Sequence, residues 1–112
     1  MINKELIAAS SKPLILSILA QQESYGYKII KEVKRLSDNN IQWKDGMLYP
    51  VLHKLENEGM IESYWKISET GRKRKYYRIK PDGKQALESQ KKQWQTVNSV
   101  FNQLWEPALC SI

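Results

Sequence analysis

Side chains suited to noncovalent recognition collect in two short stretches of this 112-residue chain. The first is polar and aromatic, and its members are Lys44, Tyr49, Pro50, His53 and Lys54. The second is an unbroken basic run, Arg72, Lys73, Arg74 and Lys75. Cationic side chains donate hydrogen bonds to phosphates, and polar side chains on a helix can reach base edges. Together these residue types favour binding to a polyanion.

The charge of the chain supports the same interpretation. The formal net charge is +6, which many small proteins share and which decides little by itself. Within residues 66–80, however, seven lysines and arginines stand against the single acid Glu69. A clustered basic segment is the electrostatic pattern of a nucleic-acid-binding surface.

Catalytic chemistry finds little support in the sequence. His53 is the only histidine, and no serine, cysteine or acid stands in an evident arrangement with it. Gly26 and Gly46 are isolated, so they form no phosphate-binding loop. We therefore expect neither an enzyme nor a cofactor.

The single cysteine, Cys110, allows no intrachain disulfide and no zinc cluster. It is either incidental or, if exposed, a redox sensor. The chain shows no signal segment and no apolar run of about 18 residues that would cross a membrane. These features predict a cytoplasmic protein.

Two helices are expected in the first third of the chain. Apolar residues recur over 4–20, where Pro13 either bends one helix or follows a restart capped by Ser10 or Ser11. Ser24 precedes a second helix over about 25–37. Its predicted buried stripe is Ile29, Val33 and Leu36.

The first recognition stretch lies on a third predicted helix, over about 46–58. Asp45 is its expected N-terminal cap, and Gly59 is its expected C-terminal cap. Pro50 should bend or weaken its first turns. The apolar side of this helix consists of Leu48, Val51, Leu52 and Leu55.

The basic run lies on a predicted β-hairpin. Residues 61–67 and 75–79 are rich in β-branched and aromatic types, with a turn at 69–71 between them. We expect Arg72–Lys75 to splay outward from this turn. Of Tyr76 and Tyr77, one should face the core and the other should brace the hairpin. Residues 81–83 should separate the hairpin from a last helix.

That last helix, over about 84–105, carries a seven-residue apolar repeat. The repeat positions are Leu87, Gln90, Trp94, Val97, Phe101, Leu104 and Ala108, and six of the seven are apolar. Pro107 should end the helix. The stripe can pack along its own domain or pair with a second chain. Pairing is favoured because an unpaired stripe would be a large exposed apolar patch. The expected interface is Leu87, Trp94, Val97, Phe101 and Leu104.

This order of elements predicts an α+β, mainly α, winged helix-turn-helix with a long C-terminal dimerisation helix. Residues 1–80 would bind double-stranded DNA, and residues 81–112 would form a homodimer. One alternative is a winged-helix scaffold that binds proteins and not DNA. RNA binding is a third possibility. RNA-binding domains of this kind carry aromatic platforms on a sheet face, whereas the aromatic residues here are expected mostly on helices and at strand ends.

Three sequence motifs resemble those of the PadR family of bacterial transcriptional regulators. They are Tyr25–Ile30, Gly46–Leu52 with Gly59–Ile61 after it, and Gly71–Tyr77 with Gly83. The short final segment is similar to the subfamily with a single C-terminal helix. The resemblance covers nearly the whole chain and implies a homodimeric winged-helix repressor.

The resemblance also implies a small aromatic effector that releases the protein from DNA. The implied effector site consists of Trp94 and Asn98 on the last helix with Ala9, Pro13 and Ser17 on the first. Trp94 would stack on a flat ligand together with its mate from the second chain. The alternative is that Trp94 is simply a core residue of the heptad repeat.

Overall fold

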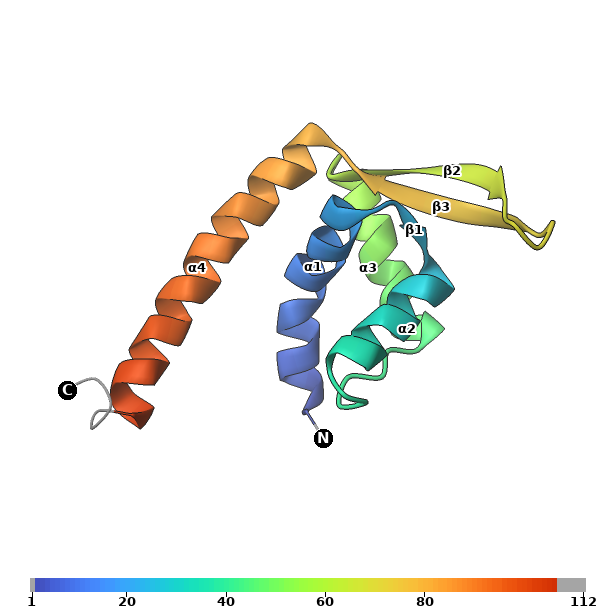
Figure 1. The fold of residues 1–112 in the computed structure, drawn as a ribbon. Coiled ribbons are helices and arrows are strands. Elements are labelled where there is room, and N and C mark those ends of the chain that lie inside the picture. The colour runs from blue at the N-terminus through green and yellow to red at the C-terminus, as the bar shows by residue number, and fades with distance from the viewer. Residues whose placement is uncertain (1, 107–112) are drawn as a thin grey trace.

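The computed structural model describes residues 2–106, and within this range it contains four helices and a three-stranded antiparallel sheet of order β1-β3-β2. The elements in chain order are α1 (Lys4–Gln21), β1 (Ser24–Tyr25), α2 (Gly26–Leu36), α3 (Asp45–Asn57), β2 (Ile61–Ile67), β3 (Lys73–Ile79) and α4 (Pro81–Trp105). Helices α1, α2 and α3 gather at one end of the sheet, while the β2–β3 hairpin and α4 extend away from them (Figure 1). This is the predicted α+β, mainly helical winged helix-turn-helix.

Helix α1 runs unbroken through Pro13, so the restart at Ser10 or Ser11 is wrong. The N-terminal cap is Asn3, whose side-chain oxygen accepts a hydrogen bond from the Leu6 backbone at 2.9 Å. The Ser10 and Ser11 hydroxyls instead donate to backbone carbonyls of the preceding turn. Pro13 lacks the N–H that would bond the Ala9 carbonyl, but Ala9 is exposed, so water can satisfy that carbonyl.

A short strand precedes α2, and the sequence did not predict it. Ser24 and Tyr25 form β1, which pairs with Tyr77 and Tyr76 of β3. Ser24 is therefore a buried strand residue, and α2 begins at Gly26 with Tyr25 at its N-cap. Two residues are too short for a recognisable strand pattern, and only the neighbouring β3 makes them one.

The apolar stripe of α2 is shorter than predicted. Ile29 and Val33 are buried, but Leu36 is exposed. Helix α2 ends at Leu36, and the chain then turns through Asp38 and Asn39, both with positive φ. Leu36, the last residue of the stripe, is therefore at the end of the helix and does not pack against the core.

Helix α3 begins one residue earlier than predicted. Lys44 occupies the N-cap position, and Asp45 lies within the first turn without a side-chain cap bond. The Asp45 carboxylate still faces the positive end of the helix dipole. Pro50 lies inside the helix and does not end it.

The predicted C-terminal cap of α3 at Gly59 is confirmed. Gly59 has φ 76°, a conformation that costs a residue without Cβ little. Its N–H donates to Glu56, and the Met60 N–H donates to Leu55 at 3.0 Å. These paired bonds are the Schellman arrangement, which turns the chain directly into β2.

The hairpin keeps the predicted β2 but has a longer β3. Strand β3 begins at Lys73 rather than at Lys75. The register pairs Ile61 with Ile79, Ser63 with Tyr77 and Ile67 with Lys73. The connection is therefore only residues 68–72, where Gly71 has φ 81°.

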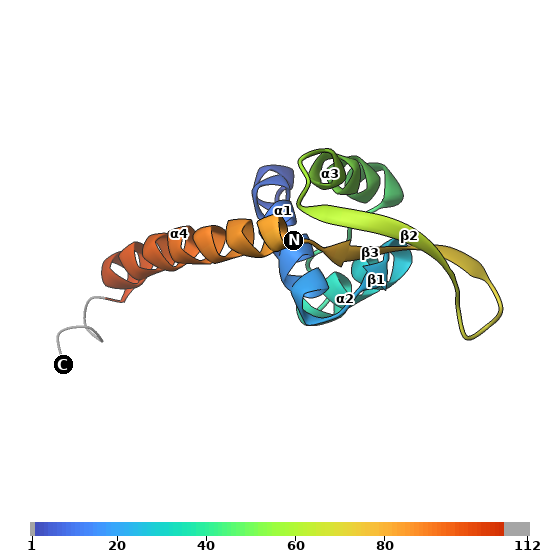
Figure 2. The same ribbon diagram turned by 90° about the horizontal axis from the view of Figure 1, so that it is seen from above.

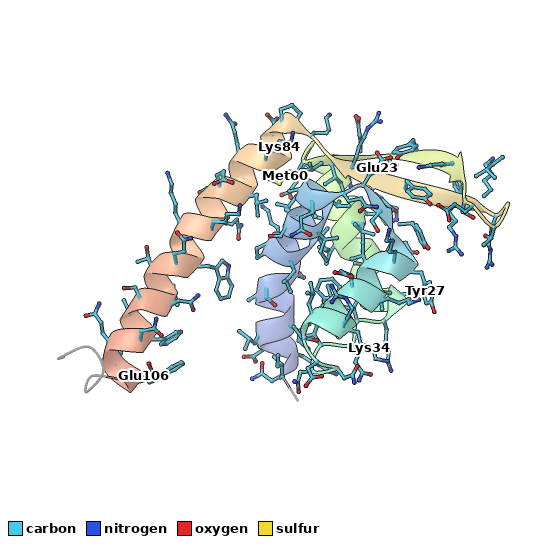
Figure 3. The ribbon with its side chains drawn as sticks, viewed as in Figure 1. Glu23, Tyr27, Lys34, Met60, Lys84 and Glu106 are labelled. Atoms are coloured by element: carbon cyan, nitrogen blue, oxygen red, sulfur yellow. The ribbon has the colours of Figure 1, made fainter. Side chains whose placement is uncertain are left out.

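Helix α4 starts at Pro81, so residues 81–83 are its first turn and not a separating loop. Proline suits this position because its missing N–H needs no partner there. Gly83 is buried against the backbone of Met60. The start of α4 thereby joins the base of the sheet, where the Lys80 N–H donates to the Met60 carbonyl at 2.9 Å (Met60 is labelled in Figure 3).

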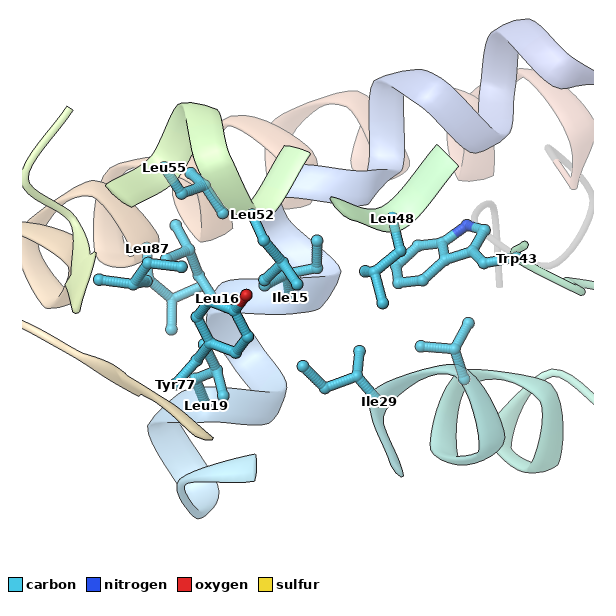
Figure 4. Close-up of a cluster of buried hydrophobic side chains, with 12 residues drawn as sticks. Ile15, Leu16, Leu19, Ile29, Trp43, Leu48, Leu52, Leu55, Tyr77 and Leu87 are labelled. Atoms are coloured by element: carbon cyan, nitrogen blue, oxygen red, sulfur yellow. The ribbon is translucent and has the colours of Figure 1, made fainter. Parts of the chain in front are cut away.

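The core lies where the three-helix bundle meets the base of the sheet. Its fully buried members include Ile15 and Leu16 of α1, Leu48 and Leu52 of α3, and Tyr77 of β3 (Figure 4). Viewed from above, the hairpin and α4 leave this centre in opposite directions (Figure 2). The two extended elements thus project from one shared core.

Two remaining features concern the surface and the end of the chain. No helix among the residues described is both long enough and apolar enough to cross a membrane. Helix α4 ends at Trp105, as predicted. Pro107, Ala108 and Cys110 lie outside the described residues, so the roles predicted for them are not described.

Candidate nucleic-acid interface

The outer face of α3 carries the first group of predicted contact residues. Leu48, Leu52 and Leu55 are fully buried, so the helix turns its other side to solvent. The residues exposed there are Lys44, Tyr49, Pro50, His53 and Lys54. The structure brings these five predicted residues together on one helix and its N-terminal entrance.

Tyr49 differs from its neighbours on this face because it also packs within the protein. Its ring lies against Gly26, the first residue of α2, and the side chain is only 37% exposed. Part of the phenol is therefore used to hold α3 against α2. Its exposed part still lies on the outer face of α3, so Tyr49 stays a predicted DNA contact.

The basic run on the hairpin is divided between two faces. Arg72 precedes β3, whereas Lys73, Arg74 and Lys75 lie within it and alternate in direction. Lys73 is exposed, but Arg74 and Lys75 are half-buried. The predicted outward splay of the whole run is therefore wrong, because the strand extends further toward the turn than the sequence indicated.

Arg74 braces the hairpin against α2. Its guanidinium carbon lies 4.4 Å from the centre of the Tyr25 ring, next to the start of α2. Its Nε is buried and has no hydrogen-bond partner in the part of the chain that the structure describes. Such a guanidinium on an aromatic ring is held by cation–π attraction and packing.

The face of the hairpin that carries Arg74 forms a closed network of its own. Arg78 donates to Glu62 at 2.6 Å, and Lys66 lies over the Tyr76 ring at 4.9 Å. Tyr76 packs between Tyr25 and Tyr64, with ring centres 5.2 and 5.9 Å away. Since Tyr77 is buried in the core, the predicted division of labour between Tyr76 and Tyr77 is confirmed.

Two tyrosines of the sheet have perturbed ionisation. Burial raises the pKa of Tyr77 to about 12, with smaller contributions from the Glu56 carboxylate and from Tyr49. Burial also raises the pKa of Tyr64 to about 12, assisted by a hydrogen bond with Glu23. Both phenols therefore remain neutral at physiological pH, and the positive character of the hairpin comes from its lysines and arginines.

Two exposed apolar residues on the hairpin were missed by the sequence analysis. Trp65 and Ile67 of β2 lie on the same side of the hairpin as Tyr77 and α3. Ser63 pairs with Tyr77, and alternate residues of a strand face the same side. If Tyr77 is assigned to the core, Trp65 and Ile67 are therefore expected on the side of the sheet that faces the core. Both were instead treated only as strand-forming residues.

The predicted dimer residues on α4 differ in their surroundings. Leu87 is 3% exposed and belongs to the core of its own protomer, so it is not free to pair with a second chain. Trp94 is half-buried, and Val97, Phe101 and Leu104 are exposed. An uncovered apolar stripe therefore begins near Trp94 and continues to the end of α4.

The predicted effector residues lie on the two helices that pack beside each other, α1 and α4. Pro13 and Ser17 are half-buried and joined, since the Ser17 hydroxyl donates to the Pro13 carbonyl at 2.6 Å. Ala9 and Asn98 are exposed. Within residues 2–106, no three side chains from His, Cys, Asp and Glu lie close enough together to hold a metal ion.

The fold and this surface define a winged helix-turn-helix protein with an accessible third helix and a basic wing, formed by residues 61–79. The model of the Transcriptional regulator PadR-like family matches residues 15–89. The chain belongs to this family, and the resemblance found in the sequence is confirmed.

Relatives and solved structures agree with this assignment. Transcriptional regulator Rv3488 of Mycobacterium tuberculosis is 33% identical over 84 residues, which are 75% of each chain. A PadR-like transcriptional regulator from Bacillus cereus is 31% identical with a TM-score of 0.82, covering 92% of this chain and 98% of its own. A transcriptional regulator from Clostridium thermocellum is 33% identical with a TM-score of 0.81, covering 92% and 97%.

Proposed function

We propose that this PadR-like regulator binds double-stranded DNA as a homodimer and represses transcription. Helix α3 would enter the major groove, which is about 12 Å wide and accepts one helix. His53 and Lys54 would reach base edges or phosphates, with Lys44 at the entrance and Pro50 shaping the exposed turn. The observation that carries this proposal is the exposure of these side chains on a helix whose other side is fully buried.

The wing would supply contacts to the DNA backbone. Arg72 and Lys73 are exposed near its tip and can neutralise phosphates. Lys75 is half-buried and lies over the Tyr77 ring at 5.7 Å, so its contact would be closer to the body of the protein. Arg74 supports the wing through Tyr25, and its effect on DNA would be indirect.

A second copy of the chain would cover the apolar stripe of α4. Trp94, Val97, Phe101 and Leu104 follow the heptad spacing of a helix pair. In a homodimer, two copies of α3 address half-sites about one helical turn of DNA apart. A regulator of this kind acts on the chromosome, and we accordingly place it in the cytoplasm.

A small aromatic effector would act by favouring a dimer whose α3 spacing no longer fits DNA. Trp94, half-buried beside α1, is the residue suited to stack on such a ligand, with Asn98, Ala9, Pro13 and Ser17 around it. A flat aromatic dye should quench tryptophan emission in the native protein and not in Trp94→Phe. Equal quenching in both proteins would assign Trp94 to packing alone.

The test of DNA binding is fluorescence anisotropy with DNA from upstream of the protein's own gene, beside a scrambled duplex, over a range of salt concentrations. A sequence-specific regulator retains preference for the native duplex near physiological salt. The double variant Arg72→Glu/Lys73→Glu should weaken binding to both duplexes and flatten the salt dependence.

Lys92→Glu, a single charge reversal outside the wing, is the control for the single variants Arg72→Glu and Lys73→Glu that make up this double variant. Lys92 is exposed on α4 at the heptad position opposite the apolar stripe, away from the wing. Its reversal should leave DNA affinity nearly unchanged. If the wing variant also binds as the wild type does, the wing has no role in DNA binding, and the protein-binding scaffold becomes the better function.

A further inference from the structure

The two faces of the wing differ in how completely their side chains are covered. Strand alternation places Trp65, Ile67, Lys73 and Lys75 on the same side as Ser63 and Tyr77. Ser63 donates to Glu56 of α3 at 2.5 Å, which fixes this side as the one that faces α3. We refer to Trp65, Ile67, Lys73 and Lys75 as the α3-side surface of the wing.

Near the base of the hairpin this side is covered by the core, but toward the tip it is bare. Tyr77 and Ile61 are buried, whereas Trp65 is 61% exposed and Ile67 is 70% exposed. The hairpin extends past α3, so α3 and the core leave these two residues largely exposed (Figure 1). An exposed tryptophan next to an exposed isoleucine forms an apolar patch of the kind found at interaction sites.

On the opposite face of the wing, each cation lies beside an acid or on an aromatic ring. Arg78 binds Glu62, and Lys66 lies 3.8 Å from Glu23. The aromatic side chains there are stacked on one another or on cations. The α3-side surface, in contrast, combines uncovered apolar side chains with two lysines.

The charge on the α3-side surface selects the kind of partner. Its β2 and β3 positions carry Lys73 and Lys75 and no acid. Lys73 Nζ lies 5.4 Å from the centre of the Trp65 ring, so the indole and a cation are presented together. A suitable partner carries a negative charge next to an apolar surface, so that it can contact Lys73 and Trp65 together. DNA meets this requirement, because each phosphate lies beside a deoxyribose ring.

We propose that Trp65, supported by Ile67, packs against the deoxyribose edge of DNA beside the segment held by α3, while Lys73 binds the adjoining phosphate. This inference rests on the proposed DNA binding and adds a contact that is not electrostatic. The wing thus contributes affinity that salt does not remove. The neighbouring lysine holds the indole in place before DNA arrives.

The experiment uses the full-length protein and a labelled duplex that it selects from a random-sequence pool. Fluorescence anisotropy is measured across a salt series for the wild type, Trp65→Ala, Lys73→Ala and Leu36→Ala. Trp65→Ala should weaken binding about tenfold or more, because a largely buried aromatic contact is lost. The slope of log affinity against log salt should stay unchanged in Trp65→Ala and should fall by about one in Lys73→Ala.

Leu36→Ala removes an exposed apolar side chain from the end of α2, which lies away from the wing, and should bind as the wild type does. Trp65→Phe keeps a flat ring and serves as a second variant that is safe for folding. DNA should quench the tryptophan emission of the wild type, and this quenching should largely disappear in Trp65→Phe.

The outcomes separate this inference from the proposed function. Wild-type affinity in Trp65→Ala, or undiminished quenching in Trp65→Phe, would overturn the Trp65 contact while DNA binding stands. A pool from which the wild type selects no duplex would overturn DNA binding and the Trp65 contact together. The surface would then be better suited to an acidic protein.

Discussion

The ring of Tyr49 on α3 lies over the α-carbon of Gly26, the first residue of α2. A Cβ added at Gly26 would come within 2.8 Å of Tyr49 Cζ, closer than real Cβ atoms approach another heavy atom. The residue before it, Tyr25, carries Arg74 and Tyr76 of the wing on its ring. The dipeptide Tyr25–Gly26 therefore contacts both parts of the candidate interface, α3 on one side and the wing on the other.

Replacing Gly26 by alanine should disturb DNA binding more than folding. The added methyl group must push the Tyr49 ring outward from its seat and so alter the face of α3. We expect about tenfold weaker DNA binding and a loss of roughly 1 kcal/mol in the free energy of unfolding. Anisotropy and urea denaturation measure the two effects.

Gly46→Ala is the control for that substitution. Gly46 lies in the first turn of α3, and a Cβ there would meet nothing within 4 Å. Alanine should stabilise the helix by up to about 1 kcal/mol and leave the Tyr49 ring in place. Equal DNA affinity in Gly26→Ala and Gly46→Ala would contradict the role assigned to the Gly26–Tyr49 contact.

A second glycine substitution should act on stability through the join between α4 and the sheet. A Cβ at Gly83 would overlap the carbonyl oxygen of Met60, which already accepts the Lys80 N–H at 2.9 Å. Because this oxygen belongs to the backbone, it cannot move aside as the end of a flexible side chain can. Gly83→Ala should therefore lower the free energy of unfolding by about 3 kcal/mol, the upper end of overpacking costs. A loss below that of Gly26→Ala in urea denaturation would refute this expectation.

Stability should fall at alkaline pH because of Tyr77. Its pKa is raised to about 12 in the folded protein, against about 10 for an unfolded chain. Between these values the unfolded state has lost the phenolic proton and the folded state keeps it. The stabilisation is therefore complete below about pH 10 and is lost as pH rises toward 12, by roughly 1–3 kcal/mol.

Thermal unfolding measured from pH 8 to pH 11.5 checks this dependence. Tyr77→Phe should reduce the loss of stability at alkaline pH. Tyr64, whose pKa is also raised, would contribute to the loss that remains. Tyr27→Phe, at an exposed ring, controls for the removal of one phenol. An unchanged alkaline decline in Tyr77→Phe would show that its ionisation is not coupled to unfolding.

The apolar stripe of α4 leads to a prediction about assembly. Phe101 is exposed and stacks on Trp105 with ring centres 4.4 Å apart. A carboxylate at this place would be buried unpaired in the proposed dimer, which costs several kcal/mol. Phe101→Glu should therefore be monomeric in sedimentation equilibrium where the wild type is dimeric, with unchanged helicity.

Lys92→Glu introduces the same charge on the opposite side of the helix and should leave assembly intact. A wild-type protein that is itself monomeric at tens of micromolar would remove the homodimer from the proposed function. If Phe101→Glu stays dimeric, the dimer forms through another surface.

Several features were accessible from sequence because they depend on neighbours along the chain. The burial of Leu48, Leu52 and Leu55 follows from helical spacing, and the cap at Gly59 follows from the need for a positive φ. The PadR-like motifs also lie in continuous segments. Strand β2 was predicted with its observed bounds for the same reason.

Other features depend on residues that are distant in the chain. Strand β1 exists only because β3 pairs with it. Leu87 fits the heptad repeat as well as Phe101 does. However, the core of the protomer covers Leu87 and leaves Phe101 exposed. The periodicity is identical at both positions, so only the placement of α4 against α1 distinguishes core from open surface.

The amino-acid sequence by itself determined the family, the order of helices and strands and the presence of a basic wing, since local spacing and backbone preference encode these. Tertiary structure alone decided that Tyr49 rests on Gly26, that Arg74 turns inward onto Tyr25, and that Trp65 is left uncovered beside Lys73. Those outcomes depend on which elements meet in space and where β3 begins. A strand that starts two residues earlier changes which side chains the core can cover.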